Sequence, residues 1–456
     1  MPSESQPGEK GANKFASGGW ASIPFEPSDA KAALAQTPQS AAVFALYGAD
    51  ARGEPYIGRT PNLRSRLARL LEPSEKHPRR LQLAGLVRRI EWKLTGSEFE
   101  SLLAQFSLFE EFFGAKAVER MHLRPPAFIR YLGSNPYPRI TVTNRPSLRE
   151  SDWAYGPFPS RAAAERFSDE MLKLFLLRRC TFELAPDPSY PGCVYSEMKM
   201  CLAPCFKGCT DERYAEESSA VQRFLATRGE SMLATLRAER DRASANLEFE
   251  AAAGFHAQVQ NVEAVRAMAA EIVRPLSRLR AVVLQASTDP GEVAVFLYEG
   301  GRLRGPAGFS TVGMRIQNEQ SGSTSLFAQP LAIEAVPEEQ GAGEQGSEGA
   351  ERQGLREQGS NKAVRNMLES RIEGVLGELS ASAAPPSSTV RQAHLALLKR
   401  WYYRPEAKRS GEICFPDAED HWPLKSILRS IGRVAAKSAA AHAAAFTKTP
   451  ESHEPS

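Results

Sequence analysis

Five of the six cysteines in this chain of 456 residues lie within a stretch of thirty residues. Those five are Cys180, Cys193, Cys201, Cys205 and Cys209. Because thiols stay reduced in the cytosol, a local group of this kind indicates metal binding rather than disulfides. Four thiolates can hold a tetrahedral Zn²⁺ ion or an iron–sulfur cluster, and spacing alone does not decide between them. Part of the chain is therefore expected to fold around a metal centre.

The composition predicts that the bulk of the chain folds into globular domains. Apolar residues make up 42% and charged residues 24%, as in a typical soluble protein, and the length corresponds to about three domains. The net charge of +3 neither favours nor excludes a nucleic acid, so local charge has to decide. We find no apolar signal segment and no run of about 18 apolar residues, so a cytoplasmic protein outside the membrane is expected.

The order of expected strands and helices predicts an α/β protein of several domains. Three strand-like runs joined by Gly-containing turns, at 279–285, 293–298 and 303–309, predict a meander in the last unit. The expected units are a disordered tail (1–35), a small α/β domain (36–145), a cysteine-rich segment (146–210), a helical hairpin (211–275), a small C-terminal α/β unit (276–446) with a disordered insert (338–362), and a polar tail (447–456).

A basic cluster lies in the first α/β domain. Between Arg59 and Ile90 there are nine Lys or Arg and two acidic residues, a local charge of +7. Phosphate contacts are the natural use of such a cluster, although a single arginine of this kind is more often part of a solvated helix face. The arginines expected to contact DNA are Arg59, Arg64, Arg69, Arg79 and Arg80.

Two short motifs precede and overlap this cluster. Ala42-Val43-Phe44 is followed by Tyr56-Ile57-Gly58, and Arg66 lies ten residues after Tyr56. The stretch resembles the core of a GIY-YIG nuclease, a small α/β domain that hydrolyses phosphodiesters with a divalent metal. The resemblance implies that Tyr56 is the general base, that Arg66 holds the phosphate, and that Mg²⁺ or Mn²⁺ is the cofactor. The alternative for Tyr56 is an ordinary half-buried aromatic residue of a strand.

Two departures from this family fall on its catalytic positions. The family takes its metal ligand from the glutamate that ends a Ser-Glu-x-Glu-Ala-Leu-Leu-Leu-Glu helix, and this chain has Gln105 there. A neutral carboxamide is a poorer ligand for Mg²⁺ than a carboxylate. Phe44 replaces the tyrosine of the first triplet and lacks its hydroxyl. These changes predict an impaired nuclease site, unless Glu110 or Glu111 substitutes for the lost ligand.

The cysteine segment carries a second resemblance. Arg179-Cys180, Pro191-Gly192-Cys193 and the run from Cys201 to Gly208 resemble the cysteine segment of the UvrC family of bacterial excinucleases. The resemblance implies that a 4Fe-4S cluster is held by four ligands. They are Cys180, Cys193, Cys201 and Cys205. Zinc is the alternative metal, and four unligated core cysteines are the simplest alternative structure.

A third resemblance lies in the expected hairpin, around residues 247–259. It is similar to the helical UVR motif by which UvrC proteins engage the helicase UvrB. The matching positions are Phe249, Glu250, Ala252 and Ala253. His256 and Ala257 replace an Arg-Asp pair of the motif, which weakens the expected interface. An alanine-rich helix without a special role is the alternative.

Residues 395–415 resemble the segment that precedes the RNase H-like nuclease domain of UvrC proteins, and that second domain is not found here. The chain is therefore identified as resembling a truncated and divergent UvrC-family member. The expected function is binding of double-stranded DNA and a UvrB-like helicase in nucleotide excision repair, with an impaired nuclease site. The alternatives are an active metal-dependent endonuclease making one incision beside a lesion, and an unrelated zinc structural protein.

Overall fold

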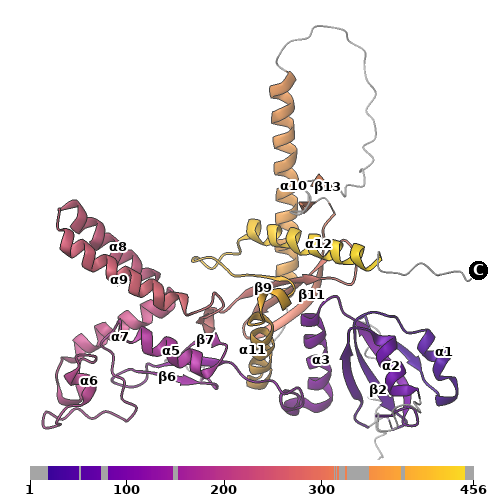
Figure 1. The fold of residues 1–456 in the computed structure, drawn as a ribbon, viewed down its shortest axis with the longest axis horizontal. Coiled ribbons are helices and arrows are strands. Elements are labelled where there is room, and N and C mark those ends of the chain that lie inside the picture. The colour runs from indigo at the N-terminus through magenta and orange to yellow at the C-terminus, as the bar shows by residue number, and fades with distance from the viewer. Residues whose placement is uncertain are drawn as a thin grey trace, which may run out of the picture.

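The computed structural model describes residues 19–50, 53–72, 81–146, 152–312, 349–381 and 386–446, with a few residues between 314 and 325. Figure 1 shows a mixed α/β protein in which three separate four-stranded sheets follow one another along the chain. The expected α/β multidomain class is confirmed at this level. Among the described residues, no helix is both long and apolar enough to cross a membrane.

The first sheet has the strand order β1-β4-β2-β3. Side chains of its central strand β2 alternate between two faces, because successive residues of a strand point in opposite directions. Phe44 packs with helix α2 on one face, and Val43 packs with helix α3 on the other. The elements of this unit are β1 (Ala21–Pro24), α1 (Ala30–Ala35), β2 (Ala42–Gly48), β3 (Tyr56–Thr60), α2 (Leu63–Leu71), β4 (Val87–Leu94) and α3 (Glu98–Phe113).

The expectation of a disordered tail through residue 35 is wrong for its second half. Strand β1 pairs with β4, with Ile23 opposite Ile90, and Phe25 is only 1% exposed. The few apolar residues of this polar stretch were enough to attach it to the sheet. Residues 1–18 lie outside the described residues.

The second sheet has the order β6-β5-β7-β8. Strands β6 and β7 belong to this separate sheet, although the first domain was expected to extend to residue 145. They pair through β5, whose buried Phe128 and Ile129 share a core with Phe167 of helix α5. The elements are β5 (Ala127–Leu132), β6 (Ile140–Thr143), β7 (Asp152–Phe158), α5 (Arg161–Met171) and β8 (Arg274–Pro275).

The expected helical hairpin contains three helices rather than two. They are α7 (Asp211–Ala226), α8 (Glu230–Ala245) and α9 (Phe249–Ala267). The chain turns between α8 and α9, where Leu247 has a φ of +62°. The hairpin of α8 and α9 projects from the body of the protein (Figure 1).

The C-terminal unit contains the expected meander. Its sheet has the order β11-β10-β9-β14, with helices α10 and α12 on one face and helices α11 and α3 on the other. The elements are β9 (Ala281–Ala286), β10 (Glu292–Glu299), β11 (Arg302–Ser310), α10 (Gly349–Ser380), α11 (Ser388–Tyr402), β14 (Glu412–Cys414) and α12 (Leu424–Phe446).

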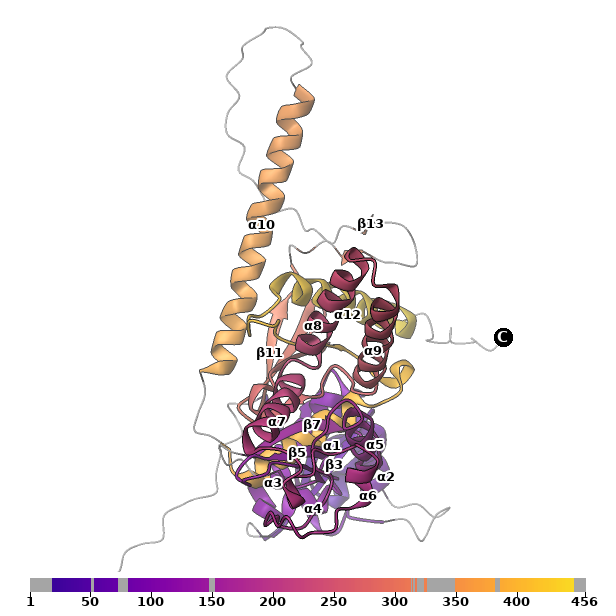
Figure 2. The same cartoon turned by 90° about the vertical axis from the view of Figure 1, so that its left-hand side faces the viewer.

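Helix α10 begins at Gly349, inside the segment 338–362 that was expected to be disordered. Residues 338–348 lie outside the described residues, so the correction concerns only the second half of that segment. The first turns of α10 point away from the rest of the protein (Figures 1 and 2). Its apolar residues Leu368, Ile372 and Leu376 follow helical spacing and anchor its second half in the core of the C-terminal unit.

Candidate functional site

Tyr56 and Arg66 meet in the first domain as the sequence predicted. Tyr56 begins β3, and Arg66 lies in the first turns of α2, where Nη2 of Arg66 donates a hydrogen bond of 3.2 Å to the hydroxyl of Tyr56. Asn62 caps α2 by accepting from the backbone N–H of Ser65, which sets where the helix starts. A phenol and a guanidinium thus share one edge of the first sheet.

Phe44 is a core residue and lies directly across from Gly58. The two residues pair between β2 and β3, and a Cβ atom on Gly58 would lie 2.6 Å from Cζ of Phe44. The Phe44 ring is 6.2 Å from the ring of Tyr56, centroid to centroid. The close approach of this ring therefore requires a glycine at position 58 in β3. The Phe44 ring fills the space against β3 but provides no hydroxyl.

Gln105 lies half-buried on α3, the helix that covers the second face of the first sheet. Its neighbour Ala104 packs in the same cluster as Ile57, which directly follows Tyr56 in β3. The family's glutamate position is thus on a helix in contact with the strand that carries Tyr56. An amide at this position carries no charge with which to hold a divalent cation.

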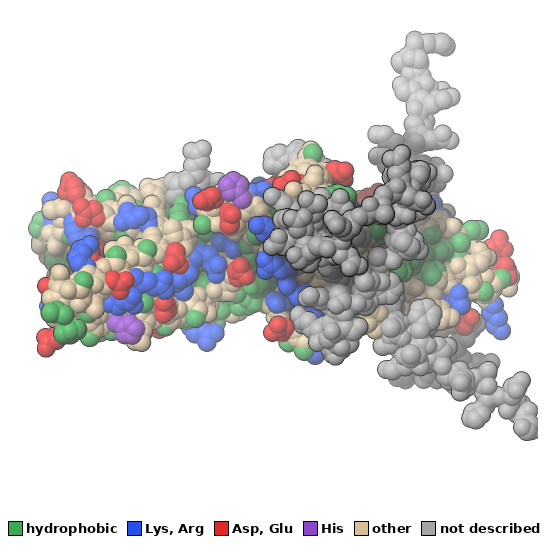
Figure 3. Space-filling view, turned by 90° about the horizontal axis from the view of Figure 1, so that it is seen from above, with side chains coloured by type: hydrophobic (Ala, Val, Ile, Leu, Met, Phe, Trp, Pro, Cys, Tyr) green, Lys and Arg blue, Asp and Glu red, His purple; other side chains and the backbone are tan. Residues whose placement is uncertain are grey.

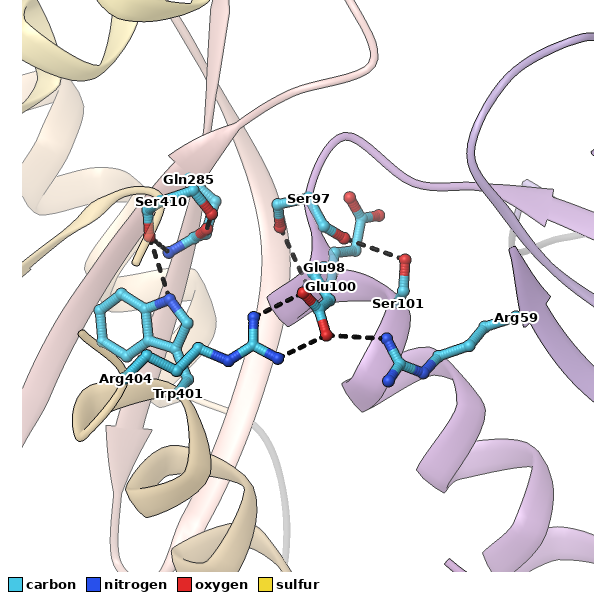
Figure 4. Close-up of polar contacts among 9 residues, drawn as sticks. All are labelled: Arg59, Ser97, Glu98, Glu100, Ser101, Gln285, Trp401, Arg404 and Ser410. Atoms are coloured by element: carbon cyan, nitrogen blue, oxygen red, sulfur yellow. Dashed lines mark hydrogen bonds and ion pairs between the residues drawn. The ribbon is translucent and has the colours of Figure 1, made fainter. Parts of the chain in front are cut away.

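Glu98, at the start of α3, binds two arginines from different units (Figure 4). Arg59 donates to it over 3.0 Å, and both terminal nitrogens of Arg404 donate to it over 2.5 and 2.6 Å. The hydrogen bonds from Arg404, followed by those from Arg59, hold the pKa of Glu98 at about 2. Arg59 is therefore already bound to a carboxylate, and Glu98 ties the first domain to the C-terminal unit.

The start of α3 is capped by Ser97 and Glu100. Ser97 accepts from the backbone N–H of Glu100, and Glu100 accepts from the backbone N–H of Gly96 over 2.8 Å. The loop in front of it passes so close to the end of β9 that a Cβ atom on Gly96 would lie 2.4 Å from the carbonyl oxygen of Ala286. The cap and this close approach fix Glu98 in place.

Glu98→Gln is expected to weaken the contact between the first domain and the C-terminal unit by about 1–2 kcal/mol at neutral pH. This value allows for screening by water, because the Glu98 side chain is 40% exposed. Because the folded pKa of about 2 lies below the ordinary 4.5, this contribution is complete above pH 4.5 and is lost as the pH falls toward 2. Unfolding curves of wild type and Glu98→Gln should therefore converge at low pH. A difference that stays constant from pH 7 to pH 2 would contradict this role.

The remaining arginines of the basic cluster do not all face outward. Arg64 donates to the backbone carbonyls of Thr37 over 2.8 Å and of Ala35 over 3.0 Å, so it fastens α1 to α2. Arg69 is exposed and free to reach a phosphate apart from one bond to the Ser65 carbonyl. Arg79 and Arg80 lie outside the described residues.

The four predicted ligand cysteines line one cavity of about 180 Å³. All of its lining residues lie in the segment of chain that connects α5 to α7. Burial, with a smaller contribution from Cys180, Cys205 and Cys193, raises the pKa of Cys201 to about 11, although the backbone N–H of Ala203 lowers it in part. Within the described ranges, no three His, Cys, Asp or Glu side chains come close enough together to hold a single metal ion. The four thiols share the lining of this cavity without forming the close ligand set of a single ion.

Arg178, which sequence reasoning missed, lines this cavity together with Arg179. Arg178 is 1% exposed and places Nη1 3.5 Å from the sulfur of Cys180, while it also donates to the carbonyls of Tyr137 and Phe182. Cationic groups beside thiolates stabilise their charge. The run Arg178-Arg179-Cys180 was the available signal, but nothing in it foretold that Arg178 is buried.

The positions matching the helicase-binding motif lie at the tip of the α8–α9 hairpin. Leu247 is 71% exposed and Phe249 is 67% exposed. Glu250 and Ala253 are also exposed, whereas Ala252 is half-buried. Two large apolar side chains are thus presented to solvent at the end of a projecting element, which is typical of a docking surface.

Comparison with known proteins adds family information. The middle-domain model of the UvrC/Cho excinucleases matches residues 128–224. Proteins named UvrABC system protein C are similar to the chain. That of Leptospira biflexa serovar Patoc (strain Patoc 1 / Ames) is 25% identical over 273 residues, which cover 60% of this chain and 44% of the relative. That of Carboxydothermus hydrogenoformans is 28% identical over 278 residues, which cover 60% of this chain and 45% of the relative.

The relative from Alcanivorax borkumensis is 29% identical over 214 residues, which cover 47% of this chain and 35% of the relative. In each of these comparisons the chain matches less than half of the relative's length. No solved structure matches the chain significantly.

Proposed function

Because this chain is a divergent member of the UvrC family, we propose that it binds double-stranded DNA in nucleotide excision repair and carries an impaired nuclease site. The observation that supports this most directly is the contact between Tyr56 and Arg66. It keeps the general base and the phosphate clamp of a GIY-YIG site together, while Gln105 stands at the position of the metal ligand.

The chemistry follows from what each group can do. The Tyr56 hydroxyl can accept a proton from an attacking water, and Arg66 can neutralise charge that develops on the phosphate. A divalent metal would stabilise the leaving oxyanion, which needs an anionic oxygen ligand that Gln105 does not supply. Phosphate binding is therefore retained and hydrolysis is slowed.

The alternative is an active endonuclease. The intact hydrogen bond between Arg66 and Tyr56 favours it, and Glu110 and Glu111 lie further along α3 as carboxylates that could replace the lost ligand. The two functions share DNA binding and differ only in turnover.

The test is a nicking assay with Mg²⁺ or Mn²⁺ on a lesion-bearing duplex preloaded with the UvrB-like helicase. We expect wild type to bind without nicking and Tyr56→Phe to behave identically. Tyr47→Phe is the matched control, because it removes a hydroxyl from β2 on the face covered by α3. Nicking by wild type that Tyr56→Phe abolishes and Tyr47→Phe retains would establish the active enzyme instead.

We also propose that the α8–α9 tip contacts the helicase and that the four cysteines hold a 4Fe-4S cluster. The exposed Leu247 and Phe249 support the first proposal, and the thiol-lined cavity supports the second. In the same assay, equal loading on the duplex with and without the helicase would argue against the first. The cluster is tested by the variants described in the Discussion.

A further inference from the structure

A second cavity lies at the base of α9, and it shares no lining residue with the cavity of the cysteines. Its volume is about 290 Å³, and Tyr155, Arg228, Glu263 and Arg266 contribute its polar lining. This is about ten times the share of one water molecule in the liquid, so a small polyatomic ion fits. Figure 3 shows basic and acidic side chains interspersed over the left-hand part of the molecule, seen from above.

Three arginines converge on the hydroxyl of Tyr155 in the second sheet. All three, Arg228 most strongly, are close enough to Tyr155 to act electrostatically on its hydroxyl. Burial, together with the charge of Arg228, lowers the pKa of Arg274 to about 10. Like charges have therefore been brought together in a place where water screens them poorly.

The nearby carboxylates neutralise only part of this group, since Glu230 pairs with Arg266 and Glu271 acts electrostatically on Arg274. Glu263 is bound to Arg237 over 2.7 Å, and Glu230 is bound to Arg266 over 3.0 Å. Among the residues that the structure describes, neither Arg228 nor Arg274 has a carboxylate partner within ion-pair distance, and Nε of each is buried without a hydrogen-bond partner. Buried donors are normally paired, so Arg228, which lines the cavity, is available to a ligand there. Arg274 does not line the cavity, and its guanidinium lies over the ring of Phe415.

The backbone of Arg228 is held in an unusual conformation. Its φ is +53°, in the turn between α7 and α8, where Gly229 follows with a φ of +81°. A non-glycine residue in the left-handed region costs about 1 kcal/mol or more, and such residues cluster at ligand-binding sites. The turn directs the Arg228 side chain to Tyr155 and to the carbonyl of Ala270 rather than into solvent.

We propose that this cavity binds a phosphate group, with Arg228 and Arg266 as direct ligands and Arg274 contributing charge. Guanidinium groups match phosphate oxygens in pairs, and an anion would supply acceptors for the unpaired nitrogens. The phosphate could belong to a DNA backbone or to a free phosphate compound, which share this chemistry. The site is independent of the nuclease-like domain, so either source would extend the proposed function.

The experiment titrates the full-length chain with inorganic phosphate at constant ionic strength and follows the thermal midpoint by calorimetry. We expect a saturable rise for wild type and an affinity at least about tenfold weaker for Arg228→Gln. Arg242→Gln is the matched control, because it removes the same charge from the exposed face of α8, where Arg242 pairs with Glu239. Arg228→Lys keeps the charge without the planar fork and should bind with intermediate affinity.

A second arm measures binding of a duplex without terminal phosphates at several salt concentrations. If the ligand is a DNA backbone phosphate, Arg228→Gln should reduce the salt slope by about one while Arg242→Gln leaves it unchanged. If it is a free phosphate, only the calorimetric arm responds to Arg228→Gln. The proposal would be overturned by two results together. Inorganic phosphate would leave the thermal midpoint of wild type unchanged, and DNA binding would be equal for Arg228→Gln, Arg228→Lys and Arg242→Gln.

Discussion

Cys201→Ser is expected to strip most of the iron from protein purified without oxygen. The Cys201 side chain is one of four that line a single cavity, and a serine hydroxyl does not replace a thiolate as a ligand for iron or zinc. Loss of one direct ligand should weaken metal binding more than the tenfold typical of outer-shell changes. Metal analysis and the visible absorbance of the purified chain give the readout.

Cys209→Ser is the matched control for this variant. Cys209 belongs to the same segment but packs against the main core, outside the cavity that the four other cysteines line. We expect Cys209→Ser to keep its full iron content. Zinc at about one ion per chain with no iron in wild type would support the zinc alternative, and equal metal loss in both variants would contradict the assignment of the four ligands.

Local patterns in the sequence predicted those parts of the fold that short-range rules govern. The meander appears where Gly-containing turns separate apolar runs, as predicted. The cap of α3 by Ser97 and Glu100 is a local contact of the same kind. The hydrogen bond between Tyr56 and Arg66 joins residues only ten positions apart. A short loop and a capped helix start are enough to bring them together.

Long-range contacts could not be predicted in the same way. Glu98 and Arg404 are 306 positions apart, and no periodicity relates them. The second sheet was missed for the same reason, since β7 pairs with β8 across the whole set of α5, α7, α8 and α9. Buried arginines such as Arg178 were invisible because residue type alone indicates exposure.

Helix α3 connects these contacts to the nuclease-like site. One side of it packs on the first sheet through Leu108, while Phe99 lies 5.3 Å from the ring of Trp401 and 5.1 Å from that of Phe296 in the C-terminal unit. Its N-terminus is held by the two arginines on Glu98 (Figure 4). The helix that carries Gln105 is thus fixed from both sides, so substitution there should change chemistry more than position.

Gln105→Glu is therefore expected to confer metal-dependent nicking on a chain that otherwise binds DNA without cutting it. The substitution restores a hard anionic oxygen on the helix that contacts the Tyr56 strand, and nearly preserves side-chain volume. A gain of about 100-fold or more over wild type is the expected scale for restoring charge stabilisation at a reacting phosphate. The readout is nicking of the helicase-loaded duplex as Mg²⁺ or Mn²⁺ is titrated.

Ser107→Glu tests whether the position of the new charge matters, because Ser107 is exposed on the same helix. It should remain inactive, and Tyr56→Phe added to Gln105→Glu should abolish the gain. If Gln105→Glu alone does not nick the duplex but the double variant with Phe44→Tyr does, the hydroxyl that Phe44 lacks is also required. The double variant buries an added hydroxyl beside Gly58, which is expected to lower its free energy of unfolding by about 1–3 kcal/mol. If neither Gln105→Glu nor the double variant nicks the duplex, this domain has lost more than its metal ligand. That result would refute the idea of an otherwise preserved nuclease scaffold.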